Sequence, residues 1–300
     1  MTRLQSEWPV WVVVGPTASG KTALALDLAR RYGAEVVACD ALQVRDGLPL
    51  LTAKPTPEET AQVPHHLYGA FPIDQPATAA GYAERADAVI ADLHARGKRV
   101  VLCGGTGLYL RALCDGLVKT PPADPALRLT LRQDAQRLGI PALHERLRLA
   151  DPDTAARIGP TDWVRIERGL EVFLQTGKPL SAWHAEHQAE RARGPRYHTI
   201  RIGLDPGPDE LRARIAARIR TWLDTGLLEE VRDCLDRHGP LKFPPIGYDA
   251  IVRHLRGQLD RDALFQELLH KTAQYARRQR TWFHADPTIT FHNHPTTVPL

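Results

Sequence analysis

The chain has 300 residues, of which 43% are hydrophobic and 25% charged, and its formal net charge is +4. These values are typical of globular proteins, so they exclude a disordered chain and a fibrous repeat. No apolar run approaches the roughly 18 residues that a membrane-spanning helix needs, so we expect a cytoplasmic protein without a membrane partner.

The first predicted elements are a strand, a loop and a helix. Residues 9–14 are apolar and β-branched, and residues 23–31 place leucines at helical spacing. The loop between them fits the pattern G-x-x-x-x-G-K-[ST], with Gly15, Pro16, Thr17, Ala18, Ser19, Gly20, Lys21 and Thr22. Its backbone amides and the helix N-terminus suit phosphate oxygens, the lysine suits an outer phosphate, and the threonine suits magnesium. The loop therefore predicts a phosphate site, without naming the phosphorylated molecule.

Two more strands are predicted at residues 35–39 and 98–103, with a helix at 79–96 between them. Strands that alternate with helices predict an α/β fold, a P-loop NTPase-like parallel sheet flanked by helices. Such sheets bind ligands beyond the carboxyl ends of their strands, where Asp40 and the turn at 104–106 would lie. Glycines, not an acid, end the third strand, so no Walker-B aspartate is apparent. For Asp40, a site carboxylate and a helix cap both remain open.

Leucine- and arginine-rich helical segments follow. They predict an inserted all-helical domain at residues 123–195, within a catalytic core formed by 1–122 and 196–300. Residues 198–204 alternate like a strand that returns to the sheet, and a long amphipathic helix carries Arg214 and Arg218 on one face. Nearly all cations beyond residue 120 are arginines, which suit phosphate and stack on bases, although solvated helix faces explain single arginines equally well.

The segment 268–285 contains no acidic residue and combines Lys and Arg with Tyr275, Trp282 and Phe283. Basic residues among aromatic ones suit an RNA backbone with stacked bases. A packed helix with its aromatic side chains in the core and its arginines in solvent is an equally good interpretation.

Several segments between about residues 10 and 284 resemble, in order, the bacterial tRNA dimethylallyltransferases. They are Asp40-Ala-Leu-Gln, Thr52-Ala-Lys-Pro, Pro64-His-His-Leu, Gly104-Gly-Thr-Gly-Leu-Tyr, Arg165-Ile-Glu-Arg, Thr176-Gly-Lys-Pro-Leu-Ser, Gly247-Tyr and Gln274-Tyr-Ala-Arg-Arg-Gln-Arg-Thr-Trp-Phe. The resemblance implies transfer of a dimethylallyl group from dimethylallyl diphosphate to the exocyclic N6 amine of the adenosine just 3′ of a tRNA anticodon. The tRNAs implied are those reading codons that start with U, and the enzyme would be a monomer.

The resemblance also implies roles for individual residues. Asp40 would be the general base, and Lys21 and Thr106 would lie near the reacting groups. One of Arg214 and Arg218 would also lie there, and the resemblance does not decide which. Mg2+ would be the cofactor, held by Thr22 and Asp40. The implied contacts to the tRNA anticodon stem-loop are Asp40, Ala41, Leu42, Gln43, Thr106, Arg128, Val164, Arg165, Ile166, Glu167, Arg168, Pro244, Pro245, Ile246, Gly247, Tyr248, Arg278 and Gln279.

The sequence departs from the family's usual pattern at four positions, Ala41, Arg45, Leu51 and Asp249. These replace the usual Ser, Tyr, Gly and Arg, which puts nucleotide preference and one phosphate contact in doubt. Two other functions remain open. An adenylate isopentenyltransferase would act on free AMP or ATP, and a P-loop kinase or RNA-binding NTPase would use ATP. The helical insertion favours tRNA, and the glycine ending of the third strand disfavours a kinase.

Overall fold

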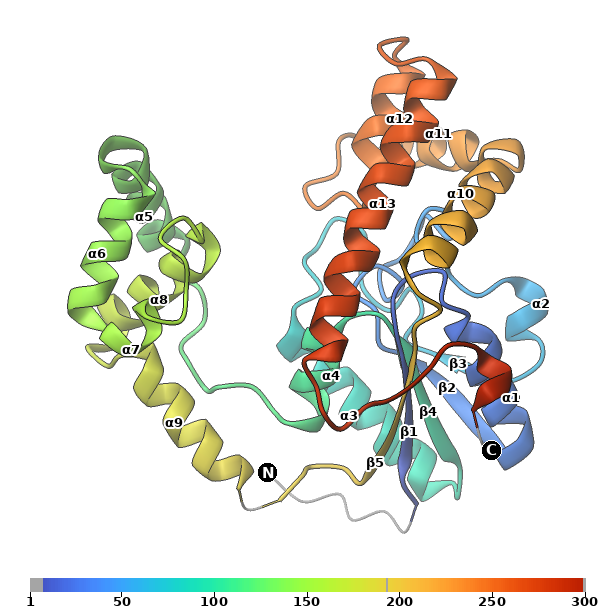
Figure 1. The fold of residues 1–300 in the computed structure, drawn as a ribbon, viewed down its shortest axis with the longest axis horizontal. Coiled ribbons are helices and arrows are strands. Elements are labelled where there is room, and N and C mark those ends of the chain that lie inside the picture. Colours follow the sequence, from blue (N-terminus) through green and yellow to red (C-terminus); the bar gives the residue numbers. More distant parts are fainter. Residues whose placement is uncertain (1–7, 193, 299–300) are drawn as a thin grey trace. The chain divides into compact units, whose positions relative to one another are not determined.

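The computed structural model describes residues 8–192 and 194–298, and the chain divides into two compact units (Figure 1). The sheet unit comprises the chain up to Asp115 and from Arg196 onward, and the helical unit comprises Gly116–Pro195. Each unit is described by itself. Within the described ranges, no helix combines the length and the apolar character that crossing a membrane requires.

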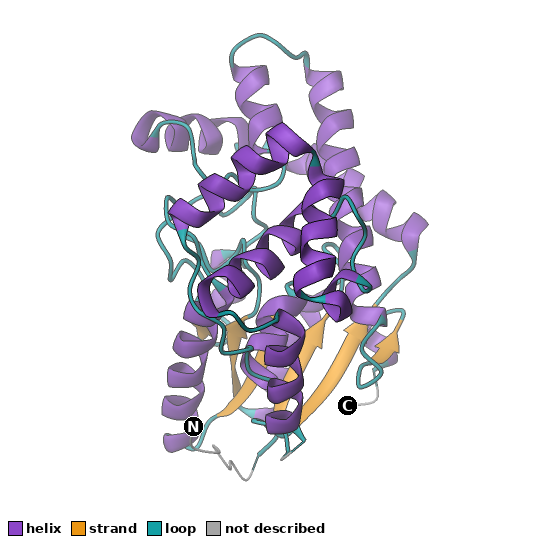
Figure 2. Cartoon of the chain, turned by 90° about the vertical axis from the view of Figure 1, so that its left-hand side faces the viewer, coloured by secondary structure: helices purple, strands orange, loops and turns teal. Residues whose placement is uncertain are grey.

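The sheet unit contains a six-stranded parallel sheet in the order β3-β2-β4-β1-β5-β6, shown in orange in Figure 2. Its strands are β1 (Val10–Val14), β2 (Ala34–Ala38), β3 (His65–His66), β4 (Arg99–Gly104), β5 (Thr199–Leu204) and β6 (Thr290–His292). The α/β prediction is confirmed, and the four longer strands lie within one residue of their predicted positions. The two edge strands were not predicted because runs of two and three residues leave no periodic signal.

Both faces of the central strands are buried. Val12 and Val14 of β1 pack into one hydrophobic cluster with Ile90 of α3 (Ala79–Ala95), whereas Val13 packs on the opposite side with Leu24 of α1 (Lys21–Tyr32). Residues in a strand alternate between faces, and a parallel sheet covered by helices on both faces reads as a continuous apolar run. This explains why the sequence of β1 is Val-Trp-Val-Val-Val.

Four helices in the second half of the chain form a further hydrophobic cluster, with Ile219, Leu227, Ile251 and Leu264 among its buried residues. They are α10 (Pro208–Asp224), α11 (Leu227–His238), α12 (Tyr248–Leu255) and α13 (Arg261–His284), which Figure 1 shows gathered together. The remaining helices of this unit are α2 (Pro57–Thr60), α4 (Gly107–Cys114) and the 3-10 helix η1 (Pro295–Thr297). The long helix α13 packs along α10 and also reaches α4, so it connects this cluster to the sheet.

In the part of the helical unit that the structure describes, the chain forms five helices. They are α5 (Pro125–Leu138), α6 (Ile140–Ala150), α7 (Pro152–Ala155), α8 (Trp163–Thr176) and α9 (Leu180–Arg191). Asp124 and Asp162 cap the N-termini of α5 and α8 by accepting hydrogen bonds from first-turn amides, which would otherwise lack partners. Leu143, Leu147 and Leu170 are buried in the unit's own hydrophobic core.

Candidate functional site

The loop at residues 15–22 leads from the end of β1 into the first turn of α1. A Cβ on Gly15 would lie 2.3 Å from the carbonyl oxygen of Leu204, so only glycine permits this passage. Gly20 precedes the helix in the left-handed conformation, with φ of 97°, and supplies no side-chain cap to the first-turn amides. Uncapped amides at a helix N-terminus form a site for an anion.

Lys21 bends back over this loop. Its ammonium donates a hydrogen bond of 2.7 Å to the carbonyl oxygen of Pro16. Burial lowers the pKa of Lys21 to about 8, an effect that the nearby groups of Cys103 and Asp40 only partly oppose. A bound anion would favour the charged form, so the loop and its lysine are suited to phosphate.

Asp40 lies just beyond β2 and is 9% exposed. Its Oδ1 accepts hydrogen bonds from the backbone amides of Leu42 and Gln43, at 2.9 and 3.4 Å, and its Oδ2 accepts one of 3.2 Å from the amide of Gly105. Thr106 completes the connection, because its hydroxyl accepts a hydrogen bond of 2.8 Å from the amide of Ala41. The carboxylate is therefore fixed from both its own loop and the glycine turn after β4.

The two arginines of α10 contact the phosphate loop differently. Arg214 donates to the carbonyl oxygen of Ser19 at 3.2 Å and is also paired with Glu210 at 2.6 Å. Arg218 donates to the hydroxyl of Thr17 at 2.8 Å, and its buried Nε has no hydrogen-bond partner among the described residues. Burial lowers the pKa of Arg218 to about 10. Buried donors without a partner are rare in folded proteins. Of the two arginines, only Arg218 has such a buried nitrogen among the described residues.

These groups surround a cavity of about 420 Å³ within the sheet unit. One part of its lining is polar, with Thr17, Lys21, Thr22, Asp40, Gln43, Arg214 and Arg218. Another part is apolar, with Leu51, Ile219, Trp222, Leu227, Ile246 and Leu268. A cavity with a cationic loop at one part and hydrocarbon at another suits a ligand that combines an anionic group with an apolar tail.

No signal in the sequence identified Trp222 and Leu227 as lining residues, and RNA stacking and core packing both remained open for the segment that contains Tyr275. Tyr275 lines the cavity, and burial raises the pKa of its phenol. The one signal for it is the spacing of Thr272 and Tyr275, which places both on one face of α13. The other two aromatic residues of this segment differ from each other. Phe283 is 1% exposed, as core packing predicts, whereas Trp282 is 38% exposed, as RNA stacking would require.

The predicted RNA contacts outside the cavity fall into different environments. In the segment before α12, Pro244 is exposed, whereas Pro245, Gly247 and Tyr248 are buried and Ile246 lines the cavity. On α13, Arg278 is exposed, whereas Gln279 is buried. The side-chain amide nitrogen of Gln43 donates a hydrogen bond to the carbonyl oxygen of Ala53, in the loop that follows β2.

In the helical unit, the predicted contacts divide along α8. Val164 and Arg165 are exposed, and Arg165 pairs with Asp162 at 2.6 Å. Ile166 belongs to the hydrophobic core, and Glu167 is also buried. A helix turns by about 100° per residue, so a run of five consecutive residues cannot present every side chain to one partner.

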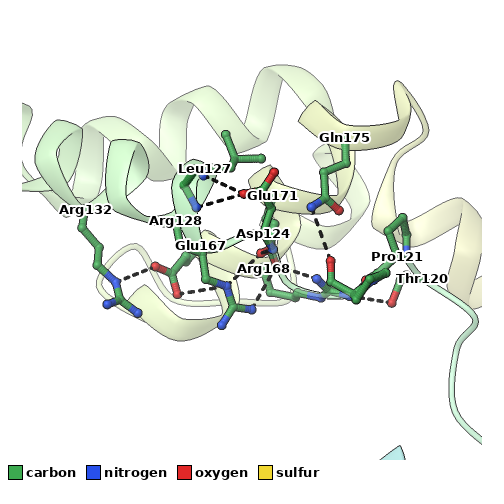
Figure 3. Close-up of polar contacts among 12 residues, drawn as sticks. Thr120, Pro121, Asp124, Leu127, Arg128, Arg132, Glu167, Arg168, Glu171 and Gln175 are labelled. Carbon is green, nitrogen blue, oxygen red and sulfur yellow. Dashed lines mark hydrogen bonds and ion pairs between the residues drawn. The ribbon is translucent and has the colours of Figure 1, made fainter.

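A cluster of ion pairs surrounds the two glutamates of α8 (Figure 3). The fully buried carboxylate of Glu171 accepts two hydrogen bonds from Arg128, at 2.8 and 3.0 Å, and one of 2.5 Å from Arg168. Arg132 pairs with Glu167 at 3.0 Å. Although burial opposes it, hydrogen bonding by Arg128 and Arg168 holds the pKa of Glu171 below its ordinary value. Arg128 and Arg168, both predicted to contact tRNA, thus already have a carboxylate partner.

Comparison with known proteins places the chain in a family. The family model for "IPP transferase" matches residues 43–286. The chain belongs to the IPP transferase family. The tRNA dimethylallyltransferase of Syntrophobacter fumaroxidans is 46% identical over 288 residues, which cover 95% of this chain and 83% of that protein.

Solved structures of the family have the same fold. The tRNA isopentenylpyrophosphate transferase of Bacillus halodurans matches with a TM-score of 0.67 and 31% identity, covering 95% of this chain and 89% of that one. A eukaryotic dimethylallyltransferase described as acting on tRNA matches with a TM-score of 0.75 and 25% identity, covering 91% of this chain and 69% of its own.

Three of the departures from the family pattern have structural roles. Arg45 is buried and donates hydrogen bonds to the carbonyl oxygens of Ile73 and Phe243. Leu51 forms part of the apolar lining of the cavity. Asp249 pairs with Lys271 at 2.6 Å. Nothing in the structure explains Ala41 beyond its amide, which donates to Thr106.

Proposed function

We propose that this protein is a prenyltransferase that moves a dimethylallyl group from dimethylallyl diphosphate to the N6 amine of the adenosine just 3′ of the anticodon, in tRNAs reading codons that start with U. The observation that carries the proposal is the cavity in which a phosphate-binding loop, a fixed carboxylate and an apolar wall meet. Membership of the IPP transferase family supports the same reaction.

The donor is bound by groups that stabilise its leaving diphosphate. The amides of residues 15–22, the ammonium of Lys21 and the guanidinium group of Arg218 bind the diphosphate, while the apolar lining holds the dimethylallyl group. As the allylic carbon–oxygen bond breaks, negative charge accumulates on the diphosphate, and positioned donors stabilise that charge. Arg218 takes this role rather than Arg214, which already pairs with Glu210.

The acceptor amine needs a base because its lone pair is delocalised into the adenine ring. Asp40 accepts the amine's proton as the nitrogen–carbon bond forms, and diphosphate departs with the electron pair of the broken bond. Three backbone amides hold the carboxylate, and an ionised carboxylate has about four acceptor sites, so its backbone partners do not saturate it. Tyr275 lines the cavity, and the hydroxyl of Thr106 accepts a hydrogen bond from the amide of Ala41, next to the base.

The residues present suit Mg2+ as a cofactor. Thr22 and Asp40 both line the cavity, and no cluster of three or more metal-ligating side chains occurs among the described residues. Mg2+ is commonly bound by one or two oxygen ligands together with substrate phosphates, which is the arrangement that this pair permits. When bound, the ion would neutralise charge on the diphosphate.

The target base must leave its stack to reach Asp40, which costs least in a single-stranded anticodon loop. Residues 41–43 contact the extruded nucleotide at the cavity, and the exposed Arg165 and Arg278 contact the anticodon stem-loop backbone. The protein acts as a monomer in the cytoplasm.

Incubation with labelled dimethylallyl diphosphate and unmodified tRNA tests this function. We expect the label in tRNA and the release of diphosphate. Label in AMP or ATP instead of tRNA would establish an adenylate isopentenyltransferase, and ATP hydrolysis without transfer would establish a kinase or NTPase. An RNA substrate that lacks the adenosine next to the anticodon is the matched control, and it should remain unlabelled.

A further inference from the structure

Gln279 of α13 connects two loops at the carboxyl edge of the sheet. Its Oε1 accepts a hydrogen bond of 2.8 Å from the amide of Thr17 in the phosphate loop, and its Nε2 donates one of 2.9 Å to the carbonyl oxygen of Gly105. The residue is 4% exposed. Both ends of its amide are therefore occupied by backbone groups from distant parts of the chain.

The glycine turn is shaped around this side chain. A Cβ on Gly105 would lie 2.1 Å from Nε2 of Gln279 and 3.0 Å from Oδ2 of Asp40, so the turn can approach both only as glycine. The amide of Gly105 also donates to Asp40. Gly105 thus joins the side chain of Gln279 to the carboxylate that serves as the base.

The helix that carries Gln279 is itself fixed beside the sheet. The next residue, Arg280, pairs with Asp205 at 2.9 Å, directly after β5. Phe283, one turn further along, is buried in the same cluster as the central strands. A side chain on a rigid helix holds its partners more accurately than one on a loop.

We infer that Gln279 is a positioning residue that holds the phosphate loop and the Asp40-bearing turn in register, and that it does not contact RNA. The inference rests on the proposed function, since it assigns the donor to one of these loops and the proton acceptor to the other. Replacing Gln279 leaves the amide of Thr17 and the carbonyl of Gly105 unpaired, which allows both loops to shift. Small displacements between reacting groups lower the rate of transfer.

The test replaces Gln279 by methionine, which has a similar length but cannot make either hydrogen bond. We expect Gln279→Met to raise KM for dimethylallyl diphosphate about tenfold and to lower kcat about tenfold, as the loss of buried hydrogen bonds predicts. The Kd for tRNA, measured by filter binding without the donor, should stay unchanged. Gln274→Met is the matched control, because Gln274 is exposed on the same helix and its amide nitrogen hydrogen-bonds with His270, away from both loops.

A weaker Kd for tRNA with unchanged donor parameters would overturn the inference and make Gln279 an RNA contact. Gln279→Asn, which keeps the amide but cannot span both partners, decides the matter if the methionine variant does not fold, as measured by thermal unfolding. Failure of both variants to fold would assign the residue to core stability and also overturn the inference. Titration with inorganic diphosphate separates this result from the proposed function, because weaker diphosphate binding by the variants can be measured even if the wild type transfers no prenyl group.

Discussion

The cavity of the sheet unit and the ion-pair cluster of the helical unit both contain arginines, but these arginines differ in how their donors are paired. Beside the cavity, the buried Nε of Arg218 has no hydrogen-bond partner among the described residues. In the cluster, Glu171 accepts hydrogen bonds from Arg128, from Arg168 and from the amide of Asp124. Unsatisfied polar groups are costly in a folded protein unless a ligand completes them. Buried atoms without a partner also occur in the helical unit, at Gln175 and Trp183, so the difference lies in the arginines. Those of the cluster pair with carboxylates of their own unit, whereas Arg218 has no carboxylate partner among the described residues and can pair with an anionic ligand.

Asp40→Asn tests the cavity side of this comparison and should have the largest effect. The amide cannot accept a proton from the substrate amine, so turnover should fall by roughly 100-fold or more, the usual worth of a general base. Binding of tRNA should be largely intact, as measured by filter binding. Asp92→Asn is the control, because Asp92 forms an exposed ion pair with Arg96 on α3. Wild-type turnover in Asp40→Asn would remove this carboxylate from the mechanism.

Glu171→Gln tests the cluster side. Removing the charge leaves Arg128 and Arg168 without their shared carboxylate partner, and breaking a buried ion pair costs about 3 kcal/mol. We expect the helical unit to unfold at lower temperature and to be cleaved sooner in limited proteolysis. Glu145→Gln breaks an exposed pair with Arg148 and should cost about 0.5 kcal/mol or less. Equal stability of the two variants would contradict a scaffold role for the cluster.

Arg218→Ala and Arg214→Ala sharpen the comparison within the cavity. A hydrogen bond to a charged group contributes about 2 kcal/mol, so losing Arg218 should raise KM for the donor roughly 30-fold. Arg214 has Glu210 as an alternative partner, and its loss should have a smaller effect. Steady-state kinetics with varied dimethylallyl diphosphate measures both. The reverse order of effects would move the diphosphate contact to Arg214.

The buried ammonium of Lys21 predicts a dependence on pH. Its pKa is lowered to about 8, so the free enzyme loses this positive charge as the pH rises through that value, well below the ordinary titration of lysine. We expect kcat/KM for the donor to fall about tenfold between pH 7 and pH 9. Lys21→Arg keeps its charge over this range and should flatten the decline. A wild-type profile that stays flat to pH 10 would contradict the lowered pKa.

Arg165→Ala should have the smallest effect of these changes. The side chain is exposed and forms an ion pair with Asp162, a partner that it can exchange for a tRNA phosphate. We expect about threefold weaker tRNA binding and a shallower dependence of the binding constant on salt, by about one phosphate contact. An unchanged salt slope would assign Arg165 to the surface of the helical unit alone.

The sequence by itself determined the features that depend on neighbouring residues. The glycine and lysine spacing at residues 15–22 predicted the loop between β1 and α1, and the alternation of strands with helices predicted the parallel sheet. The position of Asp40 directly after β2 followed from the same pattern. Each of these features follows from local periodicity and from the topology of parallel sheets, and neither depends on which distant side chains pack together.

Only the tertiary structure decided which side chains meet across the chain. Arg214 and Arg218 share one helical face, and only the packing of α10 against the phosphate loop leaves one of them with a free donor. Gln279 lies in a basic segment that suggests RNA, yet burial and two distant backbone partners place it between the loops of the site. Composition reports which charges a segment carries, whereas burial and pairing depend on residues far away in the sequence.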